Sequence, residues 1–329
     1  MKKWLQPQRE RHDPGPDLQD TGSREGHHLT QRRHRRIGVA LALLGAGTGC
    51  LDRQPALTGV PGEPGTGLSD PWPNQPAGFR AFAENDFARA MIATPSATGL
   101  LGQWSTAIMD ADNGYINDPA APKSPPGVFQ GRFPAGMAPG LASIKWQAWD
   151  AASNADNYGT EMSQIYLSLW LKLPGADFEN QTTAGTKLFY IGYGEPKTGA
   201  GNQGFAMIKW DNPQIRRDFF LRFWQRSDGS RALDQNVDTR RLMTCGVWHR
   251  FEMVLKLNDP GVANGIFRWW IDGTLITDYR DVTYIVPGGE LGFYTWKFWP
   301  YWGGVGGPNK TRDDYVQVDH AYISGVRKN

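Results

Sequence analysis

The sequence predicts an all-β domain, a sandwich or barrel of antiparallel strands, over most of its 329 residues. Short runs of alternating apolar and polar side chains follow one another from residue 127 to the C-terminus, and a period of two is typical of half-buried strands. Pro, Gly and Asn separate these runs, and many short strands with turn signals between them are typical of a sandwich or barrel. No apolar pattern of helical period continues for ten residues between them. The expected strands are Gly127–Phe133, Ser143–Trp149, Gln164–Lys172, Lys187–Tyr193, Gly204–Trp210, Asp218–Gln225, Trp248–Leu257, Ile266–Ile271, Leu275–Tyr279, Leu291–Trp299 and Tyr315–Ser324.

The stretch from residue 248 to residue 279 predicts three consecutive antiparallel strands. From Arg250 to Asn258, apolar side chains occupy nearly every second position. Asp272-Gly273 predicts a tight type I′ turn, because both central residues of that turn must tolerate positive φ. Leu275–Tyr279 is the expected return strand, so the stretch forms an antiparallel meander.

The first 50 residues have the pattern of an export signal. Residues 1–36 carry nine Lys and Arg, residues 37–49 are apolar or small (IGVALALLGAGTG), and Cys50 follows. This order predicts a lipoprotein-type signal, lipidation of Cys50 and a membrane-anchored protein of the cell envelope. An uncleaved N-terminal anchor and a translation start downstream of Met1 are alternatives. A Cys50–Cys245 disulfide is another, although Cys245 better fits a small buried apolar position.

The residues that follow the signal carry no cluster of basic side chains. Without the nine basic and five acidic residues of the first 36, there remain 26 Lys and Arg and 28 Asp and Glu. A nearly neutral, slightly acidic chain of this kind does not predict a nucleic-acid partner. Six Pro and four Gly among residues 51–76 predict an extended tether. The chain therefore divides into a signal or anchor (1–49), a tether (50–76) and one β domain (77–329).

Four sequence blocks of the predicted β domain, taken in their order along the chain, carry a resemblance to known proteins. They are TKLFYIG at Thr186–Gly192, WHRFEMVLKLNDPGVANGIFRWWIDGTLI at 248–276, YWGG at Tyr301–Gly304 and YVQVDHAYIS at 315–324. Together with SPPGVFQGRFPAGM at Ser124–Met137, the series resembles polysaccharide lyases of the alginate- and glucuronan-lyase type. The resemblance implies a concanavalin A-like β-jelly roll, a sandwich of two antiparallel sheets. It also implies a cleft on the concave face of one sheet, where a uronate polysaccharide is bound and cleaved by β-elimination.

β-Elimination needs a cation near the uronate carboxylate, a base for the C5 proton and an acid for the leaving oxygen. The resemblance places Lys187 as the cation. Strand parity adds Arg222 and Trp224, which share one face of Phe219–Arg226, and Lys209 is expected to point the same way. A guanidinium suits a carboxylate, and an indole suits the C–H face of a sugar. The alternative is an exposed sheet face that carries snorkelling cations.

Residues 293–304 (FYTWKFWPYWGG) hold seven aromatic side chains in twelve positions. We expect Trp296, Trp299 and Tyr301 to bind substrate by stacking, and Tyr294 or Tyr301 to donate the proton. Alternate residues of a strand face opposite sides, so one set of these aromatic side chains must lie in the core. Aromatic side chains that fill the core on both sides are the alternative.

The remaining titratable residues predict no cofactor. His249 has the apolar parity of its strand, which predicts a structural role, and the sequence gives His320 no acid–base partner. No His or Cys residues have the spacing of zinc ligands. Asp313, Asp314 and Asp319 are the candidates for a structural Ca²⁺, which needs several oxygen ligands.

These features together predict an exported, membrane-tethered lipoprotein. Its jelly roll is expected to bind a uronate polysaccharide, and cleavage of that polysaccharide is the further expectation. The alternative is a catalytically silent accessory subunit docked on a membrane protein complex. Converging cations in a concave groove around Arg222 and Trp224 favour the sugar, whereas a flat apolar patch there favours a protein partner.

Overall fold

The fold is described from a computed structural model over residues 72–87, 105–109, 114–142, 144–150, 161–179, 185–194, 203–209, 218–226, 230–289, 292–304 and 306–328. These residues belong to one compact unit, Gly49–Asn329. All regular elements among them are β-strands. None of the described residues form a helix long and apolar enough to cross a membrane. The predicted tether upstream of Trp72 and the predicted lipidation site Cys50 lie outside the described residues.

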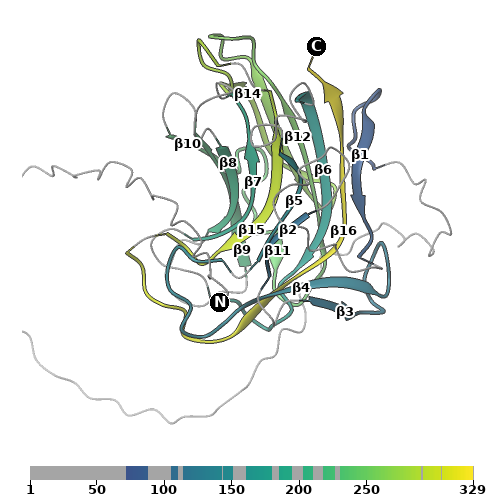
Figure 1. The fold of residues 1–329 in the computed structure, drawn as a ribbon, viewed down its shortest axis with the longest axis vertical. Helices are drawn as coiled ribbons and strands as arrows, with labels where there is room; N and C mark the ends of the chain where they lie inside the picture. The colour runs from purple at the N-terminus through teal and green to yellow at the C-terminus, as the bar shows by residue number, and fades with distance from the viewer. Residues whose placement is uncertain are drawn as a thin grey trace, which may run out of the picture. The chain divides into compact units, whose positions relative to one another are not determined.

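The strands form two antiparallel sheets, which confirms the predicted all-β sandwich. The back sheet has, in spatial order, β14 (Thr274–Val282), β13 (Gly265–Ile271), β12 (His249–Lys256), β6 (Met162–Lys172), β16 (Asp314–Arg327), β4 (Gly127–Phe133) and β3 (Gly114–Asn117), with β1 (Arg80–Asn85) also paired to β16. The front sheet has β10 (Ser230–Asp234), β9 (Asp218–Arg226), β8 (Gln203–Lys209), β7 (Thr186–Gly192), β15 (Thr295–Tyr301), β5 (Ile144–Asp150) and β2 (Ser105–Met109), with β11 (Met243–Thr244) paired to β9. In Figure 1 the strands of the front sheet bend around their outward side, which makes that side concave.

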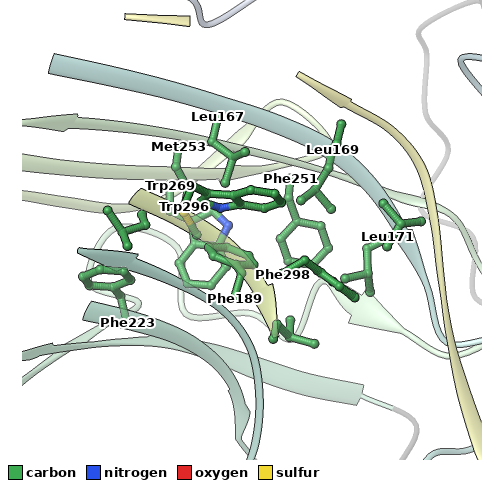
Figure 2. Packing of buried hydrophobic residues seen from close by; sticks show 14 of the residues in the cluster. Leu167, Leu169, Leu171, Phe189, Phe223, Phe251, Met253, Trp269, Trp296 and Phe298 are labelled. Atoms are coloured by element: carbon green, nitrogen blue, oxygen red, sulfur yellow. The ribbon is translucent and has the colours of Figure 1, made fainter. Parts of the chain in front are cut away.

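Aromatic and aliphatic side chains from both sheets meet between them and form the core (Figure 2). Phe223 of β9 stacks on Phe267 of β13 with ring centroids 4.7 Å apart, which joins the two sheets directly. Phe189 of β7 likewise lies 6.5 Å from Trp269 of β13. The high tryptophan content is partly explained by this core, because four Trp side chains among the described residues are fully buried: Trp146, Trp269, Trp296 and Trp302.

The predicted meander at residues 248–279 is confirmed, because β12, β13 and β14 pair consecutively and antiparallel. Asp272 and Gly273 connect β13 to β14 with φ values of 50° and 80°, as a type I′ turn requires. The Asp272 carboxylate also accepts a hydrogen bond from Arg250 N at 2.8 Å and contacts His249 Nδ1 at 2.7 Å. This aspartate therefore ties the turn to the first strand of the meander.

The residues just before β1 pack on the outward side of the back sheet. The Trp72 ring lies 4.8 Å from the Tyr322 ring and 5.4 Å from the His320 ring. Asn74 donates to the buried Glu252 carboxylate through N (3.2 Å) and Nδ2 (3.0 Å). Trp72 and Asn74, which the sequence analysis placed in the tether, are therefore held on the domain by burial of an indole and by two hydrogen bonds.

The same buried carboxylate receives a third hydrogen bond from Tyr166 Oη at 2.6 Å. Burial, with the Glu252 charge beside it, raises the pKa of Tyr166, so its hydroxyl remains a proton donor. The segment and the back sheet are thus joined through one buried carboxylate, which also accepts a hydrogen bond from Arg250 Nε at 2.9 Å.

Some strands were not predicted, and they are short. They are β1, β2, β3, β10 and β11, with two to six residues each. Sequences such as GYIN and SRALD do not alternate for long enough to be distinguished from loops. β15 begins at Thr295 and ends at Tyr301, a few residues later than the predicted Leu291–Trp299.

Candidate active site on the front sheet

The outward side of the front sheet carries a cluster of three aromatic side chains, Tyr190, Trp299 and Tyr301, which we call the platform. Their ring centroids are 5.6 Å (Tyr190–Trp299), 5.8 Å (Tyr190–Tyr301) and 4.7 Å (Trp299–Tyr301) apart. Trp299 and Tyr301 are half-buried, and Tyr190 is 6% exposed. An aromatic surface of this kind on a concave sheet can stack against the C–H face of a sugar.

Three lysines surround the platform, and we call them the platform lysines: Lys145, Lys187 and Lys297. Lys145 Nζ lies 4.5 Å from the centre of a Trp299 ring, and Lys187 Nζ lies 5.7 Å from the centre of the Tyr301 ring. Lys297 is the cross-strand partner of Tyr190 on one side and of Gln147 on the other. The platform is therefore bordered by positive charge, which suits an anionic ligand.

Irregular pairing of β7 places Lys187 at the platform. Between Lys187 and Phe189 the register of β7 against β8 shifts by one residue, and the register against β15 shifts between the same two positions. The extra residue, Leu188, is fully buried like Phe189, while Lys187 stays half-buried beside Tyr301. Bulges of this kind re-aim side chains, and here the bulge turns one lysine outward next to two consecutive core residues.

Arg222 lies on the same side of the front sheet as Lys187. Lys187 pairs with Met207, and Met207 pairs with Arg222, so the three positions form one cross-strand row. The Arg222 guanidinium, however, forms two hydrogen bonds with Asp234 on β10, one of them Nη2–Oδ2 at 2.6 Å. These hydrogen bonds raise the pKa of Arg222, and the pair offers little net charge to a ligand.

Trp224 and Lys209 were predicted beside Arg222, and only their backbones are described. Trp224 pairs with Phe205 and Ala232, and Lys209 pairs with Phe220. Their side chains fall outside the described residues, so their predicted roles stay predictions.

Trp296 was predicted to bind substrate, and its position contradicts that role. Its side chain is 0% exposed and packs between the sheets against Trp146, with centroids 5.1 Å apart. The alternation of β15 explains this, because Trp296 and Phe298 face the core while Lys297 and Trp299 face outward. Figure 2 shows Trp296 and Phe298 among the core side chains.

Tyr294, a predicted proton donor, precedes β15 and is 6% exposed. Its ring lies against Gly192, where an added Cβ would come within 2.4 Å of Tyr294 Cζ. Gly192 therefore provides the space that this ring occupies. Tyr301 is the more accessible of the two predicted donors and lies closer to Lys187 in the sheet, as its direct pairing partner.

The histidines and aspartates named from the sequence lie elsewhere. His249 is buried and bonded at both nitrogens, to Asp272 and to Thr244, which agrees with a structural role. His320 Nε2 lies 2.7 Å from Glu84 Oε1 on the back sheet, a partner that the sequence did not reveal.

The three aspartates proposed for Ca²⁺ do not converge. Asp313 binds Arg132, Asp314 binds Lys310, and Asp319 accepts hydrogen bonds from the 123–124 segment. Burial raises the pKa of Asp319, which also disfavours a role as a charged ligand. Within the described ranges, no group of three His, Cys, Asp or Glu residues is arranged to hold a metal ion.

Three residues of the candidate site were missed from the sequence: Lys145, Lys297 and Tyr190. Lys297 could have been found, because it lies between the core residues Trp296 and Phe298 in an alternating strand. Lys145 could have been found, because Ile144, Trp146 and Ala148 alternate with it and are buried. Tyr190 could not have been found from the sequence, because its outward position follows from the bulge at Leu188 and not from simple alternation.

The comparisons with known proteins identify the fold. No protein-family model and no curated protein sequence matches this chain. A solved structure of the alginate lyase Aly36B, a double mutant with bound alginate trisaccharide, has a TM-score of 0.53 and 12% identity, and covers 75% of this chain and 99% of that chain. The endo-β-1,4-glucuronan lyase of the fungus Trichoderma reesei has a TM-score of 0.45 and 13% identity, and covers 67% of this chain and 90% of that chain. The alginate lyase vAL-1 from Chlorella virus has a TM-score of 0.44 and 13% identity, and covers 65% and 89%.

The fold is therefore a concanavalin A-like β-jelly roll, as in the alginate lyase Aly36B. This fold is the one that the resemblance of the sequence blocks implied.

Proposed function

We propose that this protein binds an acidic polysaccharide on the outward side of the front sheet and cleaves it by β-elimination. The observation that carries the proposal is the platform with its three lysines. Aromatic faces suit sugar rings and ammonium groups suit uronate carboxylates, so the combination fits an acidic sugar better than a neutral one. The bound alginate trisaccharide of the structurally similar Aly36B supports the same class of substrate.

Lys187 and Tyr301 are the residues to which we assign the chemistry. In β-elimination a base removes the C5 proton, a C4–C5 double bond forms, the C4–O4 bond breaks, and O4 receives a proton. Lys187 is assigned to the uronate carboxylate, whose negative charge grows as the C5 proton leaves. Tyr301, its cross-strand partner, is assigned to both proton transfers: its phenolate removes the C5 proton, and the phenol so formed donates that proton to O4 as the C4–O4 bond breaks.

The alternative, an accessory subunit without catalytic activity, requires a surface for a protein partner. The strongly exposed large apolar side chains among the described residues are Leu141, Val237, Val247 and Val262, each in a different loop. Single exposed apolar residues are normal on a soluble surface, so they favour the sugar over a protein partner.

The test is incubation of the purified protein with alginate, polyglucuronate and a neutral glucan, followed by ultraviolet absorbance of the unsaturated product. We expect product from at least one uronate polymer, no product from the glucan, and no product from a Lys187→Ala/Tyr301→Phe double variant. Binding without product would identify a sugar-binding protein that lacks catalysis. Absence of both binding and product for every uronate polymer would refute the proposal.

We also propose that the protein is exported and held on the cell envelope by a lipid on Cys50. The order of basic segment, apolar run and cysteine in the first 50 residues supports this.

A further inference from the structure

A hollow of about 470 Å³ lies at one end of the back sheet, away from the platform. It is found where β1 begins and β16 ends, near the chain end marked C in Figure 1. Its lining includes Arg80, Phe82, Met162, Val326 and Arg327. None of these residues contributes to the proposed active site.

The two arginines of this hollow are exposed and near each other. Arg80 pairs with Gly325, and Arg327 lies two residues further along β16, which makes it the diagonal neighbour of Arg80. Diagonal neighbours in an antiparallel pair are roughly 7–8 Å apart, within reach of one ligand for side chains as long as arginine. In the described part of the chain, neither arginine has an ion pair or a side-chain hydrogen bond.

Apolar groups form the floor between the arginines. Phe82 packs against the core, and Met162 is 2% exposed. Gly325 adds no side chain opposite Arg80, and a Cβ there would come within 2.4 Å of Gln164 O and 3.3 Å of the Phe82 ring. The hollow therefore combines an apolar floor with two guanidinium groups at its rim.

We propose that this hollow is a second binding site for an acidic sugar residue, separate from the platform. The C–H face of the sugar packs on Phe82 and Val326, and its carboxylate or sulfate accepts hydrogen bonds from Arg80 and Arg327. A hollow with a floor accommodates one or two sugar rings better than it accommodates a flat bilayer surface. The chemistry of the ligand rests on the proposed function, because the hollow holds a distant part of the same acidic polymer.

A second site of this kind acts through effective concentration. A long polymer bound in the hollow keeps other segments of the same chain near the platform, whereas a short oligosaccharide gains nothing. The hollow therefore affects the apparent affinity for long substrates and not the turnover of short ones.

The test compares the Arg80→Gln/Arg327→Gln double variant with the wild type on long polyuronate and on a uronate trisaccharide. We expect roughly three- to tenfold weaker binding of the long polymer, measured by isothermal titration calorimetry, with unchanged product formation from the trisaccharide. The control is Arg240→Gln/Arg241→Gln, which removes two exposed arginines from the loop between β10 and β11. This control should bind both substrates like the wild type.

Equal affinity of the double variant and the wild type for the long polymer would overturn the inference. So would an equal loss in the control, or a loss of binding to anionic phospholipid vesicles with polymer binding intact. The proposed function fails separately, if the wild type forms no product from either substrate. In that case the long polymer still tests the hollow, because calorimetry needs no cleavage.

Discussion

Trp299 and Lys187 contact different parts of a sugar in the proposed complex, and this difference can be measured. Trp299 presents an indole, which interacts with any pyranose ring, whereas Lys187 presents a charge, which interacts with a carboxylate. Arg222 was also predicted from the sequence as a carboxylate ligand, but its guanidinium is already bound to Asp234. The three residues therefore predict three different phenotypes.

We expect Trp299→Ala to weaken binding of acidic and neutral oligosaccharides alike, by about 1–2 kcal/mol. Lys187→Ala should weaken only acidic ones, by about 2 kcal/mol, because a charge-assisted hydrogen bond is lost. Calorimetric titration with matched uronate and neutral oligosaccharides measures both effects.

Arg222→Ala is the contrast to these two variants. It should lower the free energy of unfolding by up to about 1 kcal/mol and leave the affinity for uronate oligosaccharides nearly unchanged. A larger loss of uronate affinity in Arg222→Ala than in Lys187→Ala would contradict this assignment.

At the scale of single elements, the meander of β12, β13 and β14 depends on its tight turn. Gly273 has a φ of 80°, which β-branched residues strongly disfavour. We expect Gly273→Val to lower the free energy of unfolding by about 1–3 kcal/mol, as measured by urea denaturation. Thr274→Val, at the first residue of β14, is the control and should have little effect. Equal stability of the two variants would mean that the turn conformation is wrong.

The loop that connects β15 to β16 depends on a buried lysine. Lys310 has a side chain that is 0% exposed, with Nζ 2.7 Å from Asp314 Oδ2 and 3.4 Å from Glu179 Oε2. The same ammonium lies 4.4 Å from the centre of a Trp302 ring, directly after Tyr301 of the platform. This lysine therefore joins three chain segments next to the candidate site.

Lys310→Met should lower the free energy of unfolding by about 3–5 kcal/mol, because it leaves two carboxylates without their buried cation. Thermal and urea denaturation measure the loss. Lys256→Met, at an exposed lysine on the back sheet, should change stability by less than about 0.5 kcal/mol. A similar stability for both variants would show that the Lys310 cluster is not formed in solution.

The elements that could be predicted from the sequence are those in which local pattern and tertiary position agree. β6, β12 and β13 lie inside the back sheet, and their alternation reflects one face on the core. Edge strands such as β3 and β10 are short and have few core contacts, so their residues carry little pattern. The platform was found in part, because the parity of Trp299 and Tyr301 is visible in the sequence. The Arg222–Asp234 pair was not, since it depends on which strand lies beside β9.

At the scale of the whole molecule, the domain is proposed to be attached to a membrane through the chain upstream of Trp72. We expect Cys50→Ser to release the protein from the membrane fraction or to leave its precursor unprocessed. Fractionation and mass measurement of the mature N-terminus test this. We expect the stability of the jelly roll to be unchanged, because the described strands form its core among themselves. Unchanged processing and unchanged membrane retention would contradict lipidation.

The contact of Trp72 with the back sheet determines where the upstream chain enters the domain. Trp72 and Asn74 hold the incoming chain on the outward side of the back sheet, and the platform is on the outward side of the front sheet. The chain therefore enters the domain on the side opposite the platform. The lipid anchor that we propose would therefore join the domain from the back sheet and leave the platform on the opposite side.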